Sequence, residues 1–235
     1  KTHAKMLLVT RREGRQLKRY GHLSTGNYNP RTAKLYTDIS YLTCDAKITA
    51  DMDTLFVHLA SPSRLGRMNK LISAPFHLQS KMVEKINSVG LAAANGLPAR
   101  IVAKMNSLTD PVLIQALIKA GQSGAQIDLI VRGACMLPAG VPGKTDNIRV
   151  RSIIGRFLEH SRVFFFEAGL DVFLPLALVG GGEGGDDHGE LAFCADEARG
   201  FMVRTARWKY VHFVEHPPQL FDLDADPHEL HDLGR

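Results

Sequence analysis

The feature that most constrains the fold is a regular alternation of strand-like and helix-like segments in the middle of the chain. Residues 100–105 and 126–131 are short apolar stretches of strand character, and residues 110–120 between them have a helical pattern. Asp110 followed by Pro111 is a typical helix start, because an aspartate caps free backbone N–H groups and proline fits the first turn. The alternation predicts a βαβ unit, and hence a mainly parallel sheet with helices on its faces.

Arg132 follows directly after the second strand of this unit. Open α/β sheets bind ligands beyond the carboxyl ends of their strands, so Arg132 is a candidate anion-binding residue. An arginine at a strand end is equally compatible with an ordinary surface position. Apolar spacing also predicts helices over residues 48–59 and 79–94, the second ended by Asn95-Gly96, and a basic helix is expected over residues 147–158.

A histidine, a basic residue two positions later and then an apolar run occur together twice. The first copy is KTHAKMLLVT, with His3 and Lys5, and the second is EHSRVFFF, with His160 and Arg162. Residues two apart on a strand face the same side, so each pair is expected to point together. The repeat predicts one site built from two similar halves, with His3 as a nucleophile and Lys5 as a fixed charge.

A polar loop at residues 20–30, YGHLSTGNYNP, follows the first of these strands. Its glycines, hydroxyls and backbone N–H groups suit an oxyanion, although an ordinary turn has the same composition. Its position after the His3 strand makes the anion-binding interpretation more specific. The basic residues 11–19 that precede it are expected to form a solvated hairpin end.

Composition restricts the class of protein and of partner. With 235 residues and 45% hydrophobic content, the chain can build one large or two modest domains. Its net charge of +5 favours an anionic partner, which leaves nucleic acid, a phosphorylated metabolite, a polyanion and an acidic membrane surface as alternatives.

The cysteines and the apolar runs bear on the compartment. Cys44, Cys135 and Cys194 are far apart and lack CxxC spacing, so neither a disulfide framework nor a zinc site is indicated, and a cytoplasmic location fits best. No apolar run approaches the roughly 20 residues that span a bilayer, so no transmembrane segment is expected. The chain starts within a strand-like segment and without methionine, as expected for part of a longer protein.

Four longer motifs occur in a fixed order: HAKMLLV, YGHLSTGNYNPRTAKLYTD, LIVRGACML and DNIRVRSIIGRFLEHSRVFFFEAG. In this order they resemble the two C-terminal catalytic domains of bacterial polyphosphate kinases of the first type, over about residues 1–174. The resemblance implies an α/β fold of the phospholipase D type, with mixed sheets and flanking helices in two similar halves. It divides this part into a partial first catalytic domain, 1–60, and a partial second one, 61–174.

The same resemblance implies reversible transfer of the terminal phosphate of ATP to inorganic polyphosphate through a phosphohistidine. His3 occupies the position of the phosphorylated histidine, and Lys5 is the lysine of the same motif. His160 falls at the position of the histidine of the LEH motif, which lines the nucleotide-phosphate site of the family, and it is expected to act catalytically by giving or taking the proton on the leaving or attacking phosphate. Tyr36 and Arg132 fall at the positions that bind the nucleotide phosphates.

Two further residues, His22 and Arg162, are supporting candidates. The cofactor implied is Mg²⁺ arriving with ATP, and the sequence contains no carboxylate cluster that suggests a separate metal site. The partners implied are ATP or ADP and polyphosphate, with no nucleic acid. The oligomeric state is left open, with a homo-oligomer as one alternative.

The remaining segments depart from the resemblance. After residue 174 the second phosphate-binding loop of the family is missing, and residues 175–198 are a glycine-rich linker in which the sulfatase-like DHGE at 187–190 is taken as a chance match. Residues 199–235 resemble the C-terminal end of sulfatases and phosphonate monoester hydrolases and are expected to form a β-hairpin tail. The chain thus reads as a truncated and fused kinase with weak or no turnover. The alternatives are a sulfatase-like hydrolase fragment and an inactive polyanion-binding fusion.

Overall fold

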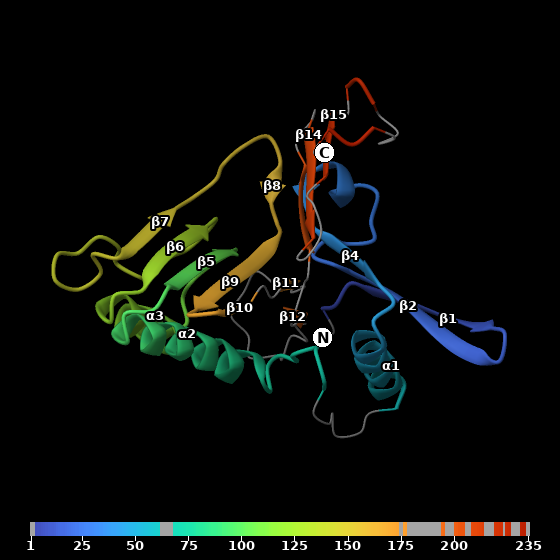
Figure 1. The fold of residues 1–235 in the computed structure, drawn as a ribbon, viewed down its shortest axis with the longest axis horizontal. Coiled ribbons are helices and arrows are strands. Elements are labelled where there is room, and N and C mark those ends of the chain that lie inside the picture. The colour runs from blue at the N-terminus through green and yellow to red at the C-terminus, as the bar shows by residue number, and fades with distance from the viewer. Residues whose placement is uncertain are drawn as a thin grey trace. The chain divides into compact units, whose positions relative to one another are not determined.

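The computed structural model describes residues 3–61, 68–173, 176–177, 194–195, 200–204, 208–213, 219–222, 224–226 and 231–233. The chain divides into two compact units, Lys1–Asp196 and Glu197–Arg235 (Figure 1). Both units are built mainly of β-sheet, and the described helices belong to the first. The mixed α/β fold class expected from the sequence is confirmed.

The first part of unit one is a small antiparallel sheet covered by one helix. Its strands, in the order β1-β2-β4, are β1 (Met6–Glu13), β2 (Gln16–Ser24) and β4 (Ser40–Thr43). Helix α1 (Ala46–Ala60) begins at Asp45, whose carboxylate accepts hydrogen bonds from the backbone N–H groups of Lys47 and Ile48. The helix buries Met52 and Leu55 in a cluster with Leu23 of β2. The helix predicted over residues 48–59 is therefore confirmed.

The larger sheet is mixed. Its order is β12-β11-β9-β5-β6-β7, with β10 also paired to β9. The strands are β5 (Ala99–Met105), β6 (Gln126–Val131), β7 (Ile148–Arg151), β9 (Arg162–Ala168), β10 (Asp171–Phe173), β11 (Leu176–Ala177) and β12 (Cys194–Ala195). Strands β5, β6 and β7 are parallel, as the βαβ pattern predicts, whereas β9 runs antiparallel to β5.

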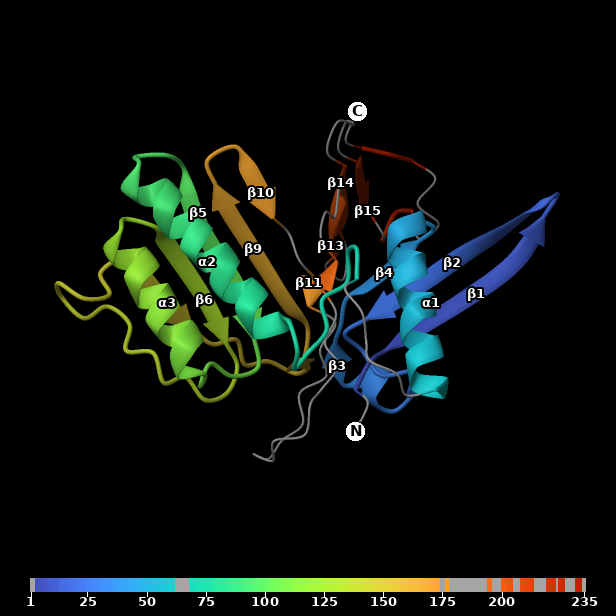
Figure 2. The ribbon, with the colours of Figure 1, turned by 90° about the horizontal axis from the view of Figure 1, so that it is seen from below.

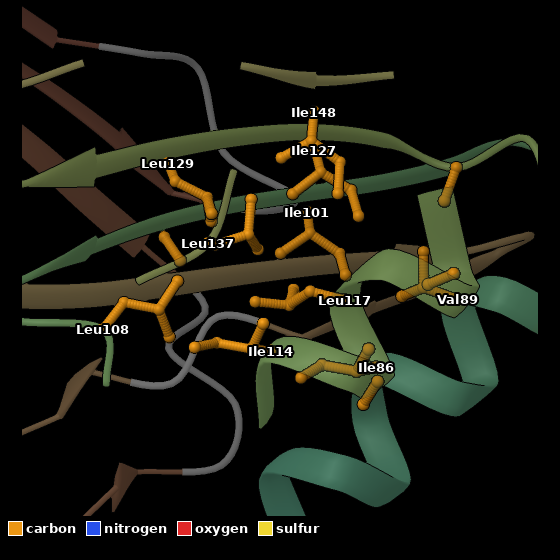
Figure 3. Packing of buried hydrophobic residues seen from close by; sticks show 14 of the residues in the cluster. Ile86, Val89, Ile101, Leu108, Ile114, Leu117, Ile127, Leu129, Leu137 and Ile148 are labelled. Carbon is orange, nitrogen blue, oxygen red and sulfur yellow. The ribbon is translucent and has the colours of Figure 1, made fainter. Parts of the chain in front are cut away.

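Two helices, α2 (Leu78–Ala94) and α3 (Pro111–Gln122), cover one face of this sheet (Figure 2). Side chains from both layers interdigitate in the main core (Figure 3). Ile101, Ile127 and Leu129 reach it from the strands, and Val89 and Leu117 from the helices. Burial of these apolar surfaces is the main force that holds the helices on the sheet.

The helix predicted over residues 147–158 is wrong. This segment forms β7, an irregular stretch and the two-residue strand β8 (Leu158–Glu159). Ile148 is 1% exposed and pairs with Ile127 of β6, while Arg149 and Arg151 are exposed. Burial therefore alternates with period two, and pairing with the edge of the sheet decides the conformation.

A short parallel pairing joins the beginning and the end of unit one. After the 3-10 helix η1 (Thr32–Lys34), strand β3 (Tyr36–Thr37) pairs with β8. Leu158 N donates to Leu35 O at 2.8 Å and Ser161 N donates to Thr37 O at 3.0 Å. The residues that follow β3 and β8 are thereby brought side by side.

The second unit is a three-stranded antiparallel sheet in the order β13-β14-β15. Its strands are β13 (Gly200–Arg204), β14 (Trp208–Phe213) and β15 (Gln219–Asp222). The predicted hairpin tail is confirmed by the β13–β14 pairing. Most of the glycine-rich segment 175–198, including the DHGE sequence, lies outside the described residues.

Candidate active site

The site is centred on a histidine–carboxylate pair at the β3–β8 junction. Asp38 follows β3 and His160 follows β8, and His160 Nδ1 lies 2.7 Å from Asp38 Oδ1. The side chain of His160 is only 12% exposed, and that of Asp38 only 18%. The pair therefore joins residues far apart in the chain in a largely buried environment.

Asp38 is held from a second direction by the polar loop. Thr25 Oγ1 donates to Asp38 Oδ1 at 2.8 Å. A Cβ on Gly26 would lie 2.7 Å from Asp38 Oδ2, so the loop can approach the carboxylate only with glycine at this position. The loop predicted to bind an oxyanion thus contacts a carboxylate of the protein itself through Thr25 and Gly26.

Electrostatics keep Asp38 ionised. Burial raises the pKa of Asp38, and hydrogen bonds from His160 and Thr25 lower it. The charge of Lys5 lowers it further, so that the net shift is below the ordinary value of 3.8. An ionised carboxylate only accepts hydrogen bonds, and His160 Nδ1 must therefore carry the proton. The Nε2 atom is left for a ligand.

Lys5 is one of the buried charged residues of the chain, at 5% exposed. It lies just before β1, and its carbonyl accepts a hydrogen bond from Ser24 N at 3.0 Å. Ser24 directly precedes Thr25, which bonds Asp38, so the backbone of Lys5 lies beside the loop that holds this carboxylate, and the Lys5 charge lowers the pKa of Asp38. His3, two residues earlier, is half-buried and also precedes β1 instead of lying within the strand as predicted.

Tyr36 and Arg132 approach the junction from β3 and from the end of β6. The rings of Tyr36 and His160 have centroids 4.9 Å apart. Arg132 Nη1 donates to the carbonyl of Glu159 at 3.3 Å, and Nη2 contacts Asn106 Oδ1. The structure thus brings Tyr36 and Arg132 to the segment that carries His160.

A second ion pair, absent from the sequence-based candidates, braces the junction. Lys104 Nζ of β5 donates to Glu159 Oε2 at 2.7 Å and to Ser161 Oγ at 2.5 Å. Thr37 Oγ1 donates to the same Glu159 oxygen at 3.0 Å. Burial raises the pKa of Glu159, but these two hydrogen bonds and the lysine charge outweigh it and lower the pKa overall.

The two supporting candidates have other surroundings. His22 lies on β2, opposite Leu7 of β1, and its Nδ1 is 2.8 Å from the hydroxyl of Tyr28. Arg162 is 8% exposed and lines a cavity of about 640 Å³ together with Phe164 and Phe166, on the side of the sheet covered by α2 and α3.

Sequence reasoning missed Asp38, Glu159, Lys104 and Asn106. A signal was present for two of them, since Asp38 ends the LYTD motif and Glu159 immediately precedes His160. Only the β3–β8 pairing shows that these acidic residues share one site. Among the described residues, no group of three or more histidine, cysteine, aspartate or glutamate side chains is arranged to hold a metal ion.

Comparison with known protein families divides unit one between its two larger sheets, with one match on either side of residues 66–70. Residues 1–65 match the model of "Polyphosphate kinase C-terminal domain 1", and residues 71–172 match that of "Polyphosphate kinase C-terminal domain 2". The chain belongs to the polyphosphate kinase family. The Asp38–His160 pair joins the two matched regions.

Individual polyphosphate kinases are similar over about three quarters of the chain. The chain is 54% identical to that of Pseudomonas aeruginosa over 177 residues, which are 75% of this chain and 26% of the relative. It is 54% identical to that of Xylella fastidiosa over 166 residues, or 71% of this chain and 24% of the relative. The chain thus spans about a quarter of these relatives.

A solved structure extends the similarity to the fold. The crystal structure of polyphosphate kinase from Porphyromonas gingivalis matches with a TM-score of 0.71 at 28% identity, covering 83% of this chain and 32% of that one. The phospholipase D-like architecture expected for the polyphosphate kinase domains is thereby supported. No helix among the described residues is both long and apolar enough to cross a bilayer.

Proposed function

We propose that this chain carries the phosphoryl-transfer site of a polyphosphate kinase, which moves the terminal phosphate of ATP reversibly to inorganic polyphosphate. The observation that carries the proposal is the buried Asp38–His160 pair at 2.7 Å, formed between two regions that both match this family. Residues 1–60 and 61–174 then supply two parts of one site. The extent of the family match, residues 1–65 and 71–172, favours this function over a sulfatase-like hydrolase.

The first step forms a phosphohistidine. The lone pair of a His3 ring nitrogen attacks the γ-phosphorus of ATP, a nitrogen–phosphorus bond forms, and the bond to the bridging oxygen of ADP breaks. In the second step a terminal oxygen of polyphosphate attacks the same phosphorus and releases His3. Each step reverses, so ATP is remade from ADP and polyphosphate.

His160 serves the proton transfer. Asp38 accepts from Nδ1 and fixes the ring. In the imidazolium form of His160, in which both ring nitrogens carry a proton, Nε2 donates its proton to the leaving oxygen of ADP, and the resulting neutral ring takes the proton back in the reverse step. Tyr36 lies against the ring on another side, at a centroid separation of 4.9 Å. The imidazole is thus oriented by both a hydrogen bond and an aromatic contact.

Cations stabilise the transferred group. Lys5, close enough to lower the pKa of Asp38, and Arg132, bonded to the carbonyl of Glu159, flank the His160 segment and would offset the charge that develops on the phosphoryl oxygens. His22 and Arg162 are proposed to support this site indirectly. Mg²⁺ would arrive bound to the phosphates of ATP, and among the described residues no group of three or more histidine, cysteine, aspartate or glutamate side chains is arranged to hold it.

Incubation with γ-labelled ATP tests the proposal. We expect an acid-labile label on the protein that is lost in His3→Ala. The matched control is His231→Ala, which removes a histidine that is 82% exposed in the second unit and should leave the label unchanged. A folded protein that takes up no acid-labile label, or labelling that survives in His3→Ala, would contradict the proposal.

A further inference from the structure

The end of the β1–β2 hairpin carries a concentration of positive charge that the proposed chemistry does not use. Arg11, Arg12, Arg15, Lys18 and Arg19 lie on or beside the turn, with Glu13 as the acidic residue among them. The hairpin extends past helix α1, and its distal part is seen at the edge of the molecule in Figure 2. The packed cluster under α1 reaches only as far as Leu8 along β1.

Acidic side chains neutralise only part of this charge. Glu13 forms ion pairs of 3.0 Å with both Arg11 and Lys18, and Arg19 pairs with Asp53 at 2.8 Å. In the part of the chain that the structure describes, no ion pair is formed by Arg12 or Arg15, and both are exposed. The hairpin end therefore keeps a net positive charge that faces solvent.

The fold gains little from these residues. Leu17, which pairs with Arg12, is 68% exposed, and like charges on neighbouring strands repel one another. A two-stranded ribbon with few packed side chains is only marginally stable in water. Concentrated charge on such a ribbon is typical of a surface that binds an opposite charge.

The hairpin leads directly from the candidate active site. Lys5 lies just before β1, and the loop that holds Asp38 follows the end of β2. Lys5 and Arg12 are separated by seven residues along the strand, or about 24 Å at 3.4 Å per residue. A ligand that contacts both ends must therefore be a long, extended anion.

We propose that the end of the β1–β2 hairpin, residues 11–19, binds the polyphosphate chain at a distance from its reacting terminus. The inference rests on the function proposed above, because it takes polyphosphate as the substrate. Exposed arginines bind a polyanion mainly by displacing its condensed counterions, so the contribution depends on salt and not on a particular base or sugar. Long chains reach the hairpin from the active site, and tripolyphosphate does not.

The test compares two charge-matched double variants of the full chain. Arg12→Gln with Arg15→Gln removes two charges at the hairpin end, and Lys119→Gln with Lys144→Gln removes two exposed charges elsewhere. Dissociation constants for long-chain polyphosphate and for tripolyphosphate are measured at several salt concentrations. Melting temperatures of both variants serve as the check on folding.

We expect the hairpin variant to bind long-chain polyphosphate about fivefold to tenfold more weakly, as two surface charge contacts predict. Its slope of log affinity against log salt should fall by about 1.4, at the roughly 0.7 per contact known for single-stranded nucleic acids. Tripolyphosphate binding and the acid-labile label from ATP should not change. The control variant should resemble the unmodified chain.

Three results would overturn the inference: unchanged binding of long polyphosphate, equal weakening in both variants, and tighter binding of a single-stranded oligonucleotide of matched charge. The labelling experiment with ATP does not involve the hairpin. Loss of the proposed function appears as a missing label, whereas failure of this inference appears only in the polyphosphate affinities, so the two are distinguishable.

Discussion

His160 and Asp38 are 122 residues apart in the chain, and their side chains meet at 2.7 Å between Nδ1 and Oδ1. The contact depends on the pairing of two short strands, β3 and β8, each of two residues. Because Asp38 is held ionised, it selects the imidazole tautomer that carries its proton on Nδ1. The position of a single carboxylate thus determines which ring nitrogen faces the substrate.

Replacing Asp38 with asparagine removes the charge and keeps the shape of the side chain. We expect the rate of label uptake from ATP to fall by about 10²–10⁴-fold, the usual range for loss of a positioned acid or base. Single-turnover kinetics with labelled ATP measure this rate. The control Asp53→Asn weakens only the surface ion pair with Arg19 and should change the rate little. An equal loss of rate in both variants would show that the Asp38–His160 pair has no special role in labelling.

The loop glycine provides an independent test of the same geometry. In Gly26→Ala the new methyl group would collide with the Asp38 carboxylate, since its position is 2.7 Å from Oδ2. We expect slower labelling and about 1–3 kcal/mol lower stability, as for other overpacked sites. Gly155→Ala is the matched control, because a Cβ there meets nothing within 4 Å. The idea fails if Gly26→Ala labels at the normal rate.

The Lys104–Glu159 pair should stabilise the junction. Both side chains are largely covered, at 17% and 22% exposed, so removing the lysine leaves a poorly solvated carboxylate. We expect Lys104→Met to lower the free energy of unfolding by about 1–3 kcal/mol. Lys81→Met, which breaks an exposed pair with Glu84, should cost less than about 1 kcal/mol. Urea denaturation measures the free energy of unfolding of both variants. A smaller loss in Lys104→Met than in Lys81→Met would contradict a stabilising role of the Lys104–Glu159 pair.

Acid should weaken the folded state through the same carboxylates. The pKa of Asp38 and that of Glu159 are both lowered in the folded protein, from ordinary values of 3.8 and 4.5. Their contribution to stability is therefore complete above these ordinary values and is lost as the pH falls below them toward the folded pKa. The free energy of unfolding is measured by urea denaturation at several pH values between about 5 and 2. It should fall less steeply with decreasing pH in the double variant Asp38→Asn with Glu159→Gln than in the unmodified chain. Identical pH dependence would mean that neither carboxylate is stabilised by folding.

Much of the fold was predictable because the signals are local. Asp110 and Pro111 mark the start of α3, and apolar spacing located α1 and α2. The helix predicted over residues 147–158 fails because the apolar and basic residues at 148–151 alternate with period two, and pairing with β6 makes these residues a strand.

The site was predictable only in part. The resemblance identified His160, Tyr36 and Arg132, all of which lie at the β3–β8 junction. Asp38 and Lys104 were missed because their partners are 122 and 55 residues away, respectively. No spacing rule connects such residues before the strands are paired.

The most direct test of the central claim is to locate the phosphate on the protein. After brief reaction with ATP, the chain is digested at alkaline pH, where phosphohistidine survives, and the peptides are sequenced by mass spectrometry. Phosphate on His3, with His160 unmodified, is the predicted result, since Asp38 holds His160 for proton transfer. Phosphate on His160, or on neither histidine, would contradict the account.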